Sequence, residues 1–370
     1  MHALVVTPGE PHSVRVAEHP VEAADGAVLV RTLEVGVCGT DREISEGVFG
    51  VAPGDERALV LGHELLGVVE RDGHGFSRGD LVTATVRRSC RRCVACEEGA
   101  PDSCLTGDYR ERGITRLHGF ARELVAEDPA QLVPIPRALG RLGVLAEPAS
   151  ICARALRHAR AIGNRQPWRA ERALVIGAGA IGMLATYLLR LEGLDVWTAA
   201  LDPPGSPRAG LVEASGARYV ASRETPLEDL RDDVGGFDLV VEAAGDAQLM
   251  AATLGLLRRS GVACLLGIDP RERTVELDGP TIGLDAVLEN RVLFGSVNAH
   301  REDWVAAVDG LARARERWPE ALERFVTLRV PLDRFGEAFE HRGVKATLVL
   351  GETGSIPLAE AHGLDVAGPS

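Results

Sequence analysis

The chain has 370 residues, of which 45% are hydrophobic and 26% charged, enough for a sizeable core and for two domains. Asp and Glu outnumber Lys and Arg by 54 to 41, and the net charge of −13 argues against nucleic acid or an anionic membrane as the main partner. Lys345 is the only lysine, so a Schiff-base lysine or a lysine-dependent phosphate loop is not expected.

The beginning of the chain lacks the basic region and the long apolar segment of a secretory signal. Residues 173–189 carry no charge, but this stretch is shorter than the roughly 20 apolar residues of a spanning helix and contains three glycines. We therefore expect a cytoplasmic protein without membrane contact. In that compartment, clustered cysteines indicate metal binding or chemistry rather than disulfides.

The predicted elements change in character near residue 150. The first part has short strands between Gly, Pro and Asp turns, at 27–34, 59–70, 80–86 and 121–126. After a helix over 149–162, strands alternate with helices such as 247–257; the strands are predicted at 173–176, 196–200, 239–242, 261–266 and, as a further buried strand, 292–297. An amphipathic helix at 304–318, mixed structure over 325–351 and a loose tail at 352–370 complete the chain. The alternation predicts an α/β fold with a parallel sheet covered on both faces.

Three glycines form a G-x-G-x-x-G motif between a predicted strand and a predicted helix. Gly177 allows a tight turn, Gly179 allows close approach to a pyrophosphate, and Gly182 allows close helix–strand packing. The backbone at Ala180 and Ile181 opens the helix, where free N–H groups and the helix dipole favour phosphate. The motif therefore predicts dinucleotide binding.

An acidic residue at the end of the next predicted strand strengthens this interpretation. Asp202 lies 20 positions after Gly182, where a carboxylate can hold the adenosine ribose hydroxyls. The same carboxylate would repel a 2′-phosphate, so NAD is favoured over NADP. Arg208 is close enough in sequence to be an alternative ligand for that phosphate. The simpler interpretation is a glycine-rich turn followed by a surface aspartate.

Cys90, Cys93, Cys96 and Cys104 place four thiols within 15 residues. Four thiolates in one loop are typical of a closed tetrahedral zinc site, which would stabilise the fold rather than take part in catalysis. Disulfides or an iron–sulfur cluster are the alternatives. The expected compartment and the absence of a proline after the last cysteine favour zinc.

A second set of residues suits a catalytic metal. Cys38 follows a predicted strand, His63 and Glu64 lie beside another, and Glu147 begins a helix. A thiolate, an imidazole and one or two carboxylates suit zinc with an open position, where the metal acts as a Lewis acid on a bound alcohol. Taken singly, these residues could be a small buried cysteine, a core histidine and an acid at a helix N-terminus.

These motifs occur in the order found in one enzyme family. GVCGTD, LGHE, the four-cysteine loop, EPAS, GAGAIG and GSVN follow one another between about residues 2 and 350. The chain resembles the zinc-dependent medium-chain dehydrogenases, and in particular the archaeal-type glucose dehydrogenases. The resemblance implies a GroES-like β-barrel catalytic domain over 1–150 and a Rossmann doubly wound parallel-sheet domain over 151–297. Residues 298–370 would return to the catalytic domain and form a tail.

The resemblance also implies roles around the catalytic zinc. Its ligands would be Cys38, His63 and a carboxylate, with Glu64 and Glu147 exchanging places or a water between them. Thr40 would begin a proton relay from the substrate hydroxyl, and its alternative role is a helix N-cap.

Two further residues match family positions that contact sugar hydroxyls. These are Glu111 and Asn298, whose alternative interpretations are a solvated loop charge and a strand-end turn residue. The chain departs from NADP-dependent glucose dehydrogenases after the second strand of the nucleotide-binding domain, where residues 201–204 read Leu-Asp-Pro-Pro instead of carrying arginines. The loop over 86–89 is also altered.

The sequence thus predicts a zinc-dependent enzyme, with one catalytic and one structural zinc. It would transfer hydride from a secondary or anomeric hydroxyl of a sugar, polyol or (amino)cyclitol to NAD(P). The resemblance implies a homodimer or homotetramer. The alternatives are a simple alcohol or threonine-type dehydrogenase, a zinc-free reductase of the same fold, and a non-catalytic zinc-stabilised binding protein.

Overall fold

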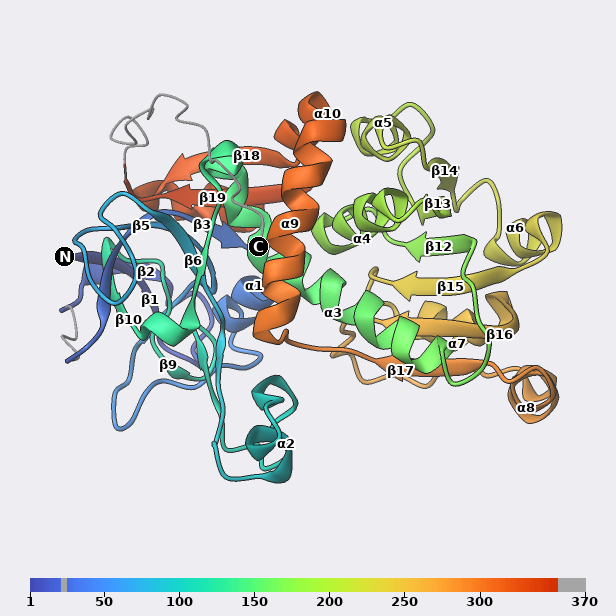
Figure 1. The fold of residues 1–370 in the computed structure, drawn as a ribbon, viewed down its shortest axis with the longest axis horizontal. Coiled ribbons are helices and arrows are strands. Elements are labelled where there is room, and N and C mark those ends of the chain that lie inside the picture. Colours follow the sequence, from blue (N-terminus) through green and yellow to red (C-terminus); the bar gives the residue numbers. More distant parts are fainter. Residues whose placement is uncertain (21–24, 352–370) are drawn as a thin grey trace, which may run out of the picture.

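The computed structural model describes residues 1–20 and 25–351, so the predicted tail lies outside the described residues. Two parts lie side by side in Figure 1: a β-rich part built from the first and last segments, and an α/β part built from the middle of the chain. The helices α3 (Ala146–Gly163) and α9 (Arg301–Arg317) pack against each other between them.

The β-rich part contains one large sheet and two small ones. The large sheet has the order β11-β6-β5-β3-β19-β18, and β10 also pairs with β3. Its strands are β3 (Val28–Val37), β5 (Glu64–Val69), β6 (Leu81–Ala84), β10 (Leu124–Glu127), β11 (Leu132–Pro134), β18 (Val326–Pro331) and β19 (Lys345–Val349). The small sheets are formed by β2 (Arg15–Glu18), β1 (His2–Val6) and β4 (Leu59–Val60), and by β7 (Arg87–Arg88), β8 (Arg110–Arg112) and β9 (Arg116–Leu117).

One predicted strand of this part is interrupted. The segment predicted as a strand over 59–70 forms β4 and β5, with a break at Gly62, whose φ of +87° is incompatible with extended structure. The break has a functional consequence, because it places His63 in the connection that leads into β5.

The α/β part is a single parallel sheet, as the alternation predicted. Its strand order is β14-β13-β12-β15-β16-β17. The strands are β12 (Arg172–Ile176), β13 (Asp195–Ala200), β14 (Arg218–Ala221), β15 (Phe237–Glu242), β16 (Leu257–Leu265) and β17 (Val292–Gly295). The helices between them are α4 (Ala180–Leu191), α5 (Pro207–Ala214), α6 (Leu227–Val234), α7 (Ala247–Leu256) and α8 (Ala286–Leu288).

The prediction of a buried strand over 292–297 was wrong in two respects. β17 ends at Gly295, and among the strands of the described residues it is the outermost of its sheet, with a strand partner on one side only. Leu293 is 37% exposed and Val297, beyond the strand, is 63% exposed. The pattern of apolar residues indicates a strand but not its position in the sheet. Only the order of strands in the sheet decides which of them lies at the edge.

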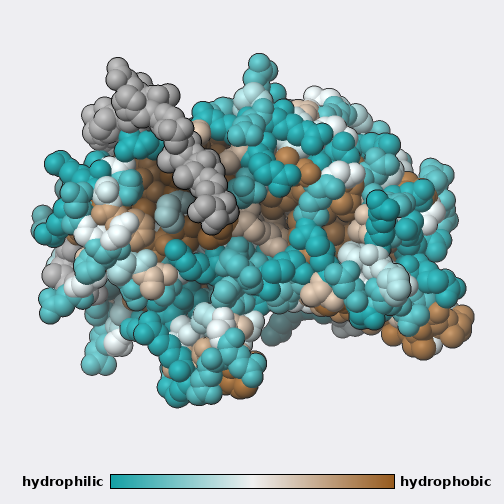
Figure 2. Space-filling model, in the orientation of Figure 1, coloured by the Kyte–Doolittle hydropathy of each residue, from teal (hydrophilic) through white to brown (hydrophobic). Residues whose placement is uncertain are grey.

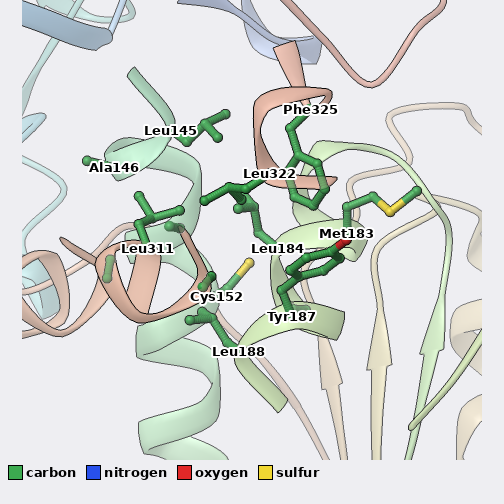
Figure 3. Packing of buried hydrophobic residues seen from close by; sticks show 14 of the residues in the cluster. Leu145, Ala146, Cys152, Met183, Leu184, Tyr187, Leu188, Leu311, Leu322 and Phe325 are labelled. Carbon is green, nitrogen blue, oxygen red and sulfur yellow. The ribbon is translucent and has the colours of Figure 1, made fainter. Parts of the chain in front are cut away.

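Alternate residues of the central strand β12 belong to two separate cores. Val175 packs in a cluster with residues of α3, α4 and α9, shown in Figure 3, whereas Leu174 and Ile176 pack with α6 and α7. Each fully buried aliphatic side chain of this kind contributes about 1.5–3 kcal/mol. Burial on both faces explains why the strand reads as a continuous apolar run.

Helix α3 connects the two parts of the molecule. It begins at Ala146, three residues before the predicted start, and the proposed domain boundary at residue 150 falls inside it. Helix α9 also begins three residues early, at Arg301, where His300 and Asp303 form a capping box. The remaining α-helices are α1 (Gly39–Ser45), α2 (Val94–Glu97), α10 (Pro319–Glu323) and α11 (Phe335–Glu340). Within the described ranges, none of the helices has the length and apolar character needed to cross a bilayer.

Candidate active site

The predicted catalytic cluster converges in the structure. Cys38 follows β3 and is the N-cap of α1, and its Sγ lies 3.1 Å from Nε2 of His63. One ligand atom each from Cys38, His63 and Glu64 lie within 4.8 Å of one another. His63 and Glu64 are 4% and 1% exposed. A buried thiol, imidazole and carboxylate at this spacing fit a zinc ion.

Asp41 supports two members of this cluster. Its Oδ1 lies 3.5 Å from Nδ1 of His63, and its Oδ2 accepts a hydrogen bond of 2.9 Å from the backbone N–H of Cys38. Burial by itself lowers the pKa of His63. The neighbouring Cys38 and Asp41 raise this pKa by more than burial lowers it, so that it stands well above its ordinary value. A carboxylate behind Nδ1 orients the ring so that Nε2 faces a metal.

Asp41 stands in the GVCGTD motif, but the motif by itself assigns it no role. The signal was local, because Asp41 is the third residue after Cys38, in a capping-box arrangement. Its approach to His63 appears only in the fold. Thr40 is the second residue of α1 and is half-buried. Since Cys38 is the N-cap, the alternative of Thr40 as an N-cap was wrong.

The only lysine lies in this site, which the sequence analysis did not foresee. Lys345 begins β19 and forms an ion pair with Glu64, and both side chains are almost completely buried. Gly36 of β3 makes room for the pair, because a Cβ at this position would lie 1.8 Å from Oε2 of Glu64. Lys345 is therefore a counter-ion of the cluster, a role that amino-acid counts could not reveal.

Glu147 faces the same cluster from the first turn of α3. Burial raises the pKa of its carboxyl to about 7, while the charges of His63 and Lys345 act in the opposite direction. Among the described residues Glu147 has no ion-pair partner within 4 Å, in contrast to Glu64. Glu147 is thus a buried carboxylate of this region that has no direct ion-pair partner among the described residues.

The four cysteines of the second predicted metal site also converge. Their Sγ atoms lie within 4.8 Å of one another, and the pairs Cys93–Cys96 and Cys90–Cys96 are 3.4 and 3.8 Å apart. All four are free thiols, so the alternative of disulfides was wrong. A hydrogen bond with the Thr106 hydroxyl is the main cause that lowers the pKa of Cys104 to about 6. The donor set fits a tetrahedral zinc ion.

A third grouping, His19, Glu56 and His118, does not fit a metal. Nδ1 of His118 accepts a hydrogen bond of 3.1 Å from the backbone N–H of Val60. The neutral ring must then carry its proton on Nε2, which donates to Glu56 at 3.1 Å. Both ring nitrogens are engaged, so His118 offers no lone pair to an ion.

The glycine motif has the geometry of a dinucleotide turn. Gly177 has a φ of +105°, and a Cβ there would lie 2.9 Å from the backbone of Ala243. A Cβ at Gly182 would lie 1.9 Å from the Gly177 carbonyl oxygen, whereas a Cβ at Gly179 would meet nothing within 4 Å. Gly179 is the N-cap of α4 and supplies no side-chain cap, so the helix presents free N–H groups beside open space. This arrangement fits a pyrophosphate.

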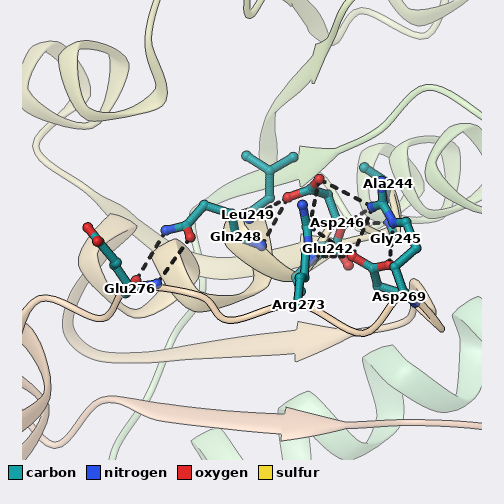
Figure 4. Close-up of polar contacts among 11 residues, drawn as sticks. Glu242, Ala244, Gly245, Asp246, Gln248, Leu249, Asp269, Arg273 and Glu276 are labelled. Atoms are coloured by element: carbon teal, nitrogen blue, oxygen red, sulfur yellow. Dashed lines mark hydrogen bonds and ion pairs between the residues drawn. The ribbon is translucent and has the colours of Figure 1, made fainter.

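The loop after β15, whose backbone lies against Gly177, is held by a polar network that Figure 4 shows. The buried carboxylate of Glu242, at the end of β15, accepts hydrogen bonds of 2.8 and 2.9 Å from the backbone N–H groups of Ala244 and Gly245. Asp246 caps α7, and Arg273 lies 2.8 Å from both Asp246 and Asp269. The loop that touches Gly177 is therefore fixed by several independent contacts.

Asp202 and Arg208 meet at the carboxyl end of β13. Nη1 of Arg208 lies 3.3 Å from the Asp202 carboxylate, and the Tyr219 hydroxyl donates to the Asp202 carbonyl at 2.7 Å. Nη2 of Arg208 also donates to the carbonyls of Arg342 and Gly343, which precede β19 in the other part of the molecule. Both terminal nitrogens of Arg208 are thus engaged.

The two predicted substrate residues have different surroundings. Glu111, on β8, forms an ion pair with Arg87 at 2.9 Å, so it is not a solvated loop charge. Asn298 follows β17, has a φ of +68° and is 8% exposed. Its buried Nδ2 has no hydrogen-bond partner in the described part of the chain. An orphaned buried amide is a group that a substrate hydroxyl could satisfy.

Two family models match the sequence and together cover most of it. The model described as "Alcohol dehydrogenase GroES-like domain" matches residues 24–137, and "Glucose dehydrogenase C-terminus" matches residues 140–350. Glucose 1-dehydrogenase of Methanocella arvoryzae is 42% identical over 346 residues, covering 92% of this chain and 96% of that protein. Glucose 1-dehydrogenase of Thermoproteus tenax is 40% identical over 358 residues, covering 94% and 99%.

Solved structures agree with the fold. Haloferax mediterranei glucose dehydrogenase in complex with NADP, Zn and gluconolactone superposes with a TM-score of 0.87 at 35% identity, covering 95% of this chain and all of that one. L-idonate 5-dehydrogenase from Escherichia coli, at 22% identity and a TM-score of 0.78 over 94% of this chain and 98% of that one, shares the fold. The predicted GroES-like barrel with a Rossmann parallel-sheet domain is confirmed.

Proposed function

Because the chain belongs to the zinc-dependent medium-chain dehydrogenase family, close to the archaeal glucose 1-dehydrogenases, we propose that it oxidises a hydroxyl of a sugar, polyol or cyclitol with NAD(P). The observation that carries the proposal is the buried convergence of Cys38, His63 and Glu64, with Asp41 behind the imidazole. A structural scaffold has no need of such a cluster, because burying these groups without a metal is costly.

Cys38 and His63 would hold the catalytic zinc together with a carboxylate. Glu147 is the carboxylate whose charge a zinc ion would compensate, whereas Glu64 already has Lys345 as a counter-ion. When bound, the metal supplies the positive charge that favours loss of the proton from a substrate hydroxyl. Thr40, next to the cluster at the start of α1, would accept that proton first.

A second zinc ion, with a structural role, would be held by Cys90, Cys93, Cys96 and Cys104. The four Sγ atoms leave no position for a substrate, since all four tetrahedral ligands come from the protein. The dinucleotide would lie across Gly177–Gly182, with its nicotinamide directed towards the catalytic cluster.

NAD is the cofactor that the charges around Asp202 favour. Its carboxylate can accept hydrogen bonds from ribose hydroxyls but would repel a 2′-phosphate. Arg208 does not reverse this preference, because Asp202 and the carbonyls of Arg342 and Gly343 already occupy its terminal nitrogens.

The protein would assemble as a homodimer, or as a tetramer built from such dimers. The edge strand β17 leaves backbone groups unpaired, and beside it the segment around α8 exposes Ile282, Leu284, Val287 and Leu288 by 39–68%. Figure 2 shows an apolar patch at the place of α8 in Figure 1. A second copy related by a two-fold axis would pair with the edge and cover the patch.

A substrate panel tests the proposal. Neutral sugars, polyols and cyclitols, their amino analogues and simple alcohols would be incubated with NAD or NADP, and the absorbance of the reduced cofactor measured. We expect turnover of a polyhydroxylated substrate that is lost in H63A. Activity that survives in C38S would indicate zinc-free chemistry. If E111Q and N298A leave turnover unchanged, a simple alcohol dehydrogenase is favoured, and no turnover in any assay would favour a binding protein.

A further inference from the structure

Arg87 forms an ion pair with Glu111, the carboxylate that is proposed to contact the substrate. Arg87 on β7 and Glu111 on β8 are direct cross-strand partners. Both Nε and Nη2 of Arg87 lie 2.9 Å from the same carboxylate oxygen, Oε1 of Glu111. The two side chains are only 9% and 15% exposed, so water screens the pair poorly.

The guanidinium of Arg87 cannot easily turn away from Glu111. Its Nη1 donates a hydrogen bond of 2.7 Å to the carbonyl of Asp102, in the loop of the four cysteines. The ring of Tyr109 stacks against it, with the centroid 3.9 Å from the guanidinium carbon. The second carboxylate oxygen of Glu111, Oε2, has no hydrogen-bond partner among the described residues. The pair therefore presents one free acceptor next to a fixed positive charge.

The chain around Glu111 packs directly against the catalytic segment. Two residues after Glu111, a Cβ at Gly113 would lie 2.5 Å from the Gly62 carbonyl oxygen. Gly62 immediately precedes His63, so β8 and the metal cluster are held at a fixed separation. This contact places β8, the strand that carries Glu111, against the segment that borders the catalytic cluster.

We propose that Arg87 is a specificity-determining residue that makes this end of the site accept uncharged hydroxyls and reject ammonium groups. The proposal rests on the proposed function and on the role of Glu111 as a substrate contact. A hydroxyl can donate a hydrogen bond to Oε2 without bringing a charge. An ammonium group would lose its water beside a guanidinium whose repulsion cancels the attraction of the carboxylate. The substrate class is accordingly a neutral sugar, polyol or cyclitol, not an amino-substituted one.

The test compares a neutral substrate with analogues in which each non-reacting hydroxyl in turn is replaced by an ammonium group. For wild type, we expect kcat/KM to favour the neutral parent by at least about tenfold over the analogue whose ammonium group meets Glu111. In R87Q, this preference should shrink at least about tenfold for the analogue whose ammonium group meets Glu111. R87K keeps the positive charge and should retain most of the discrimination. A general loss of structure would not explain discrimination that is retained in R87K and reduced in R87Q.

The control is R92Q, which removes an exposed ion pair with Asp108 from the same loop and should leave the ratios unchanged. If R87Q does not fold, E111Q decides instead. With the carboxylate neutral and Arg87 uncompensated, discrimination against ammonium should increase, and a decrease would overturn the proposal. Wild-type turnover of every amino analogue as efficient as that of the parent, or unchanged ratios in R87Q, would also overturn it while leaving the dehydrogenase function intact. Absence of turnover with every neutral polyhydroxylated compound would overturn both.

Discussion

Lys345 and Glu64 form a buried ion pair although they stand 281 residues apart in the chain. The strands that carry them, β19 and β5, both pair with β3, and Gly36 of β3 leaves the space that the two side chains fill. Strand β19, the last strand of the described residues, thus supplies the counter-ion for a carboxylate of the proposed catalytic cluster. The site therefore includes a residue from β19, the strand with which the chain returns to the β-rich part.

Replacing this lysine with a neutral residue of similar size should destabilise the protein. K345M leaves the Glu64 carboxylate buried without its partner, and such a change costs about 3–5 kcal/mol. The free energy of unfolding, measured with a denaturant, should fall by that amount at pH 7. K345R keeps the charge and should lose less. If K345M and E64Q/K345M are equally unstable, the uncompensated charge is not the cause.

Removal of the Asp202 carboxylate should weaken the preference for NAD. In D202A, kcat/KM for NAD should fall about tenfold, the value of one charged hydrogen bond of about 1.5 kcal/mol. Arg208 is then released from Asp202, so the use of NADP should rise. In D202A/R208Q this gain should disappear. D195A removes an exposed aspartate from β13, the strand that Asp202 follows, and serves as the control. An unchanged NAD-to-NADP ratio in D202A would contradict the assignment.

Metal analysis should find about two zinc ions per chain, which can be lost separately. C93S should lose one zinc and unfold at a lower temperature. H63A should lose the other, together with at least about 100-fold of the activity, because several kcal/mol of Lewis-acid stabilisation disappear. Elemental analysis beside thermal unfolding gives both readouts. A wild-type content of one zinc that H63A does not change would support a scaffold instead of an enzyme.

A charge in the exposed apolar patch should weaken self-association. Val287 on α8 is 68% exposed, and V287D would place an unpaired carboxylate in the proposed interface. Sedimentation analysis should show the dimer dissociation constant rising at least about tenfold, since each 1.4 kcal/mol has that effect. V305D changes a valine on α9 that is 53% exposed and should have no effect. Equal sedimentation of V287D and wild type would rule out this patch as the interface.

The local motifs were predictable from the sequence because all residues of each motif lie close together in the chain. The glycines of 177–182 belong to one strand–turn–helix unit, and the cysteines of 90–104 lie in one loop, so spacing alone indicates a phosphate turn and a zinc site. The alternation of apolar segments likewise predicted a parallel sheet covered by helices. The prediction of Cys38, His63, Glu64 and Glu147 as a set depended on the order of motifs along the chain.

Tertiary structure decided which charges meet. Asp41 reaches His63, Lys345 reaches Glu64, and Arg87 reaches Glu111 only because particular strands are neighbours. The exposed edge of β17 has the same origin, since an apolar segment does not reveal its place in the strand order. By itself the sequence determined the turns and the fold class and predicted the types of metal ligand, because these depend on neighbouring residues. Ion-pair partners and exposed edges depend on strand pairing between distant segments, and these required the folded chain.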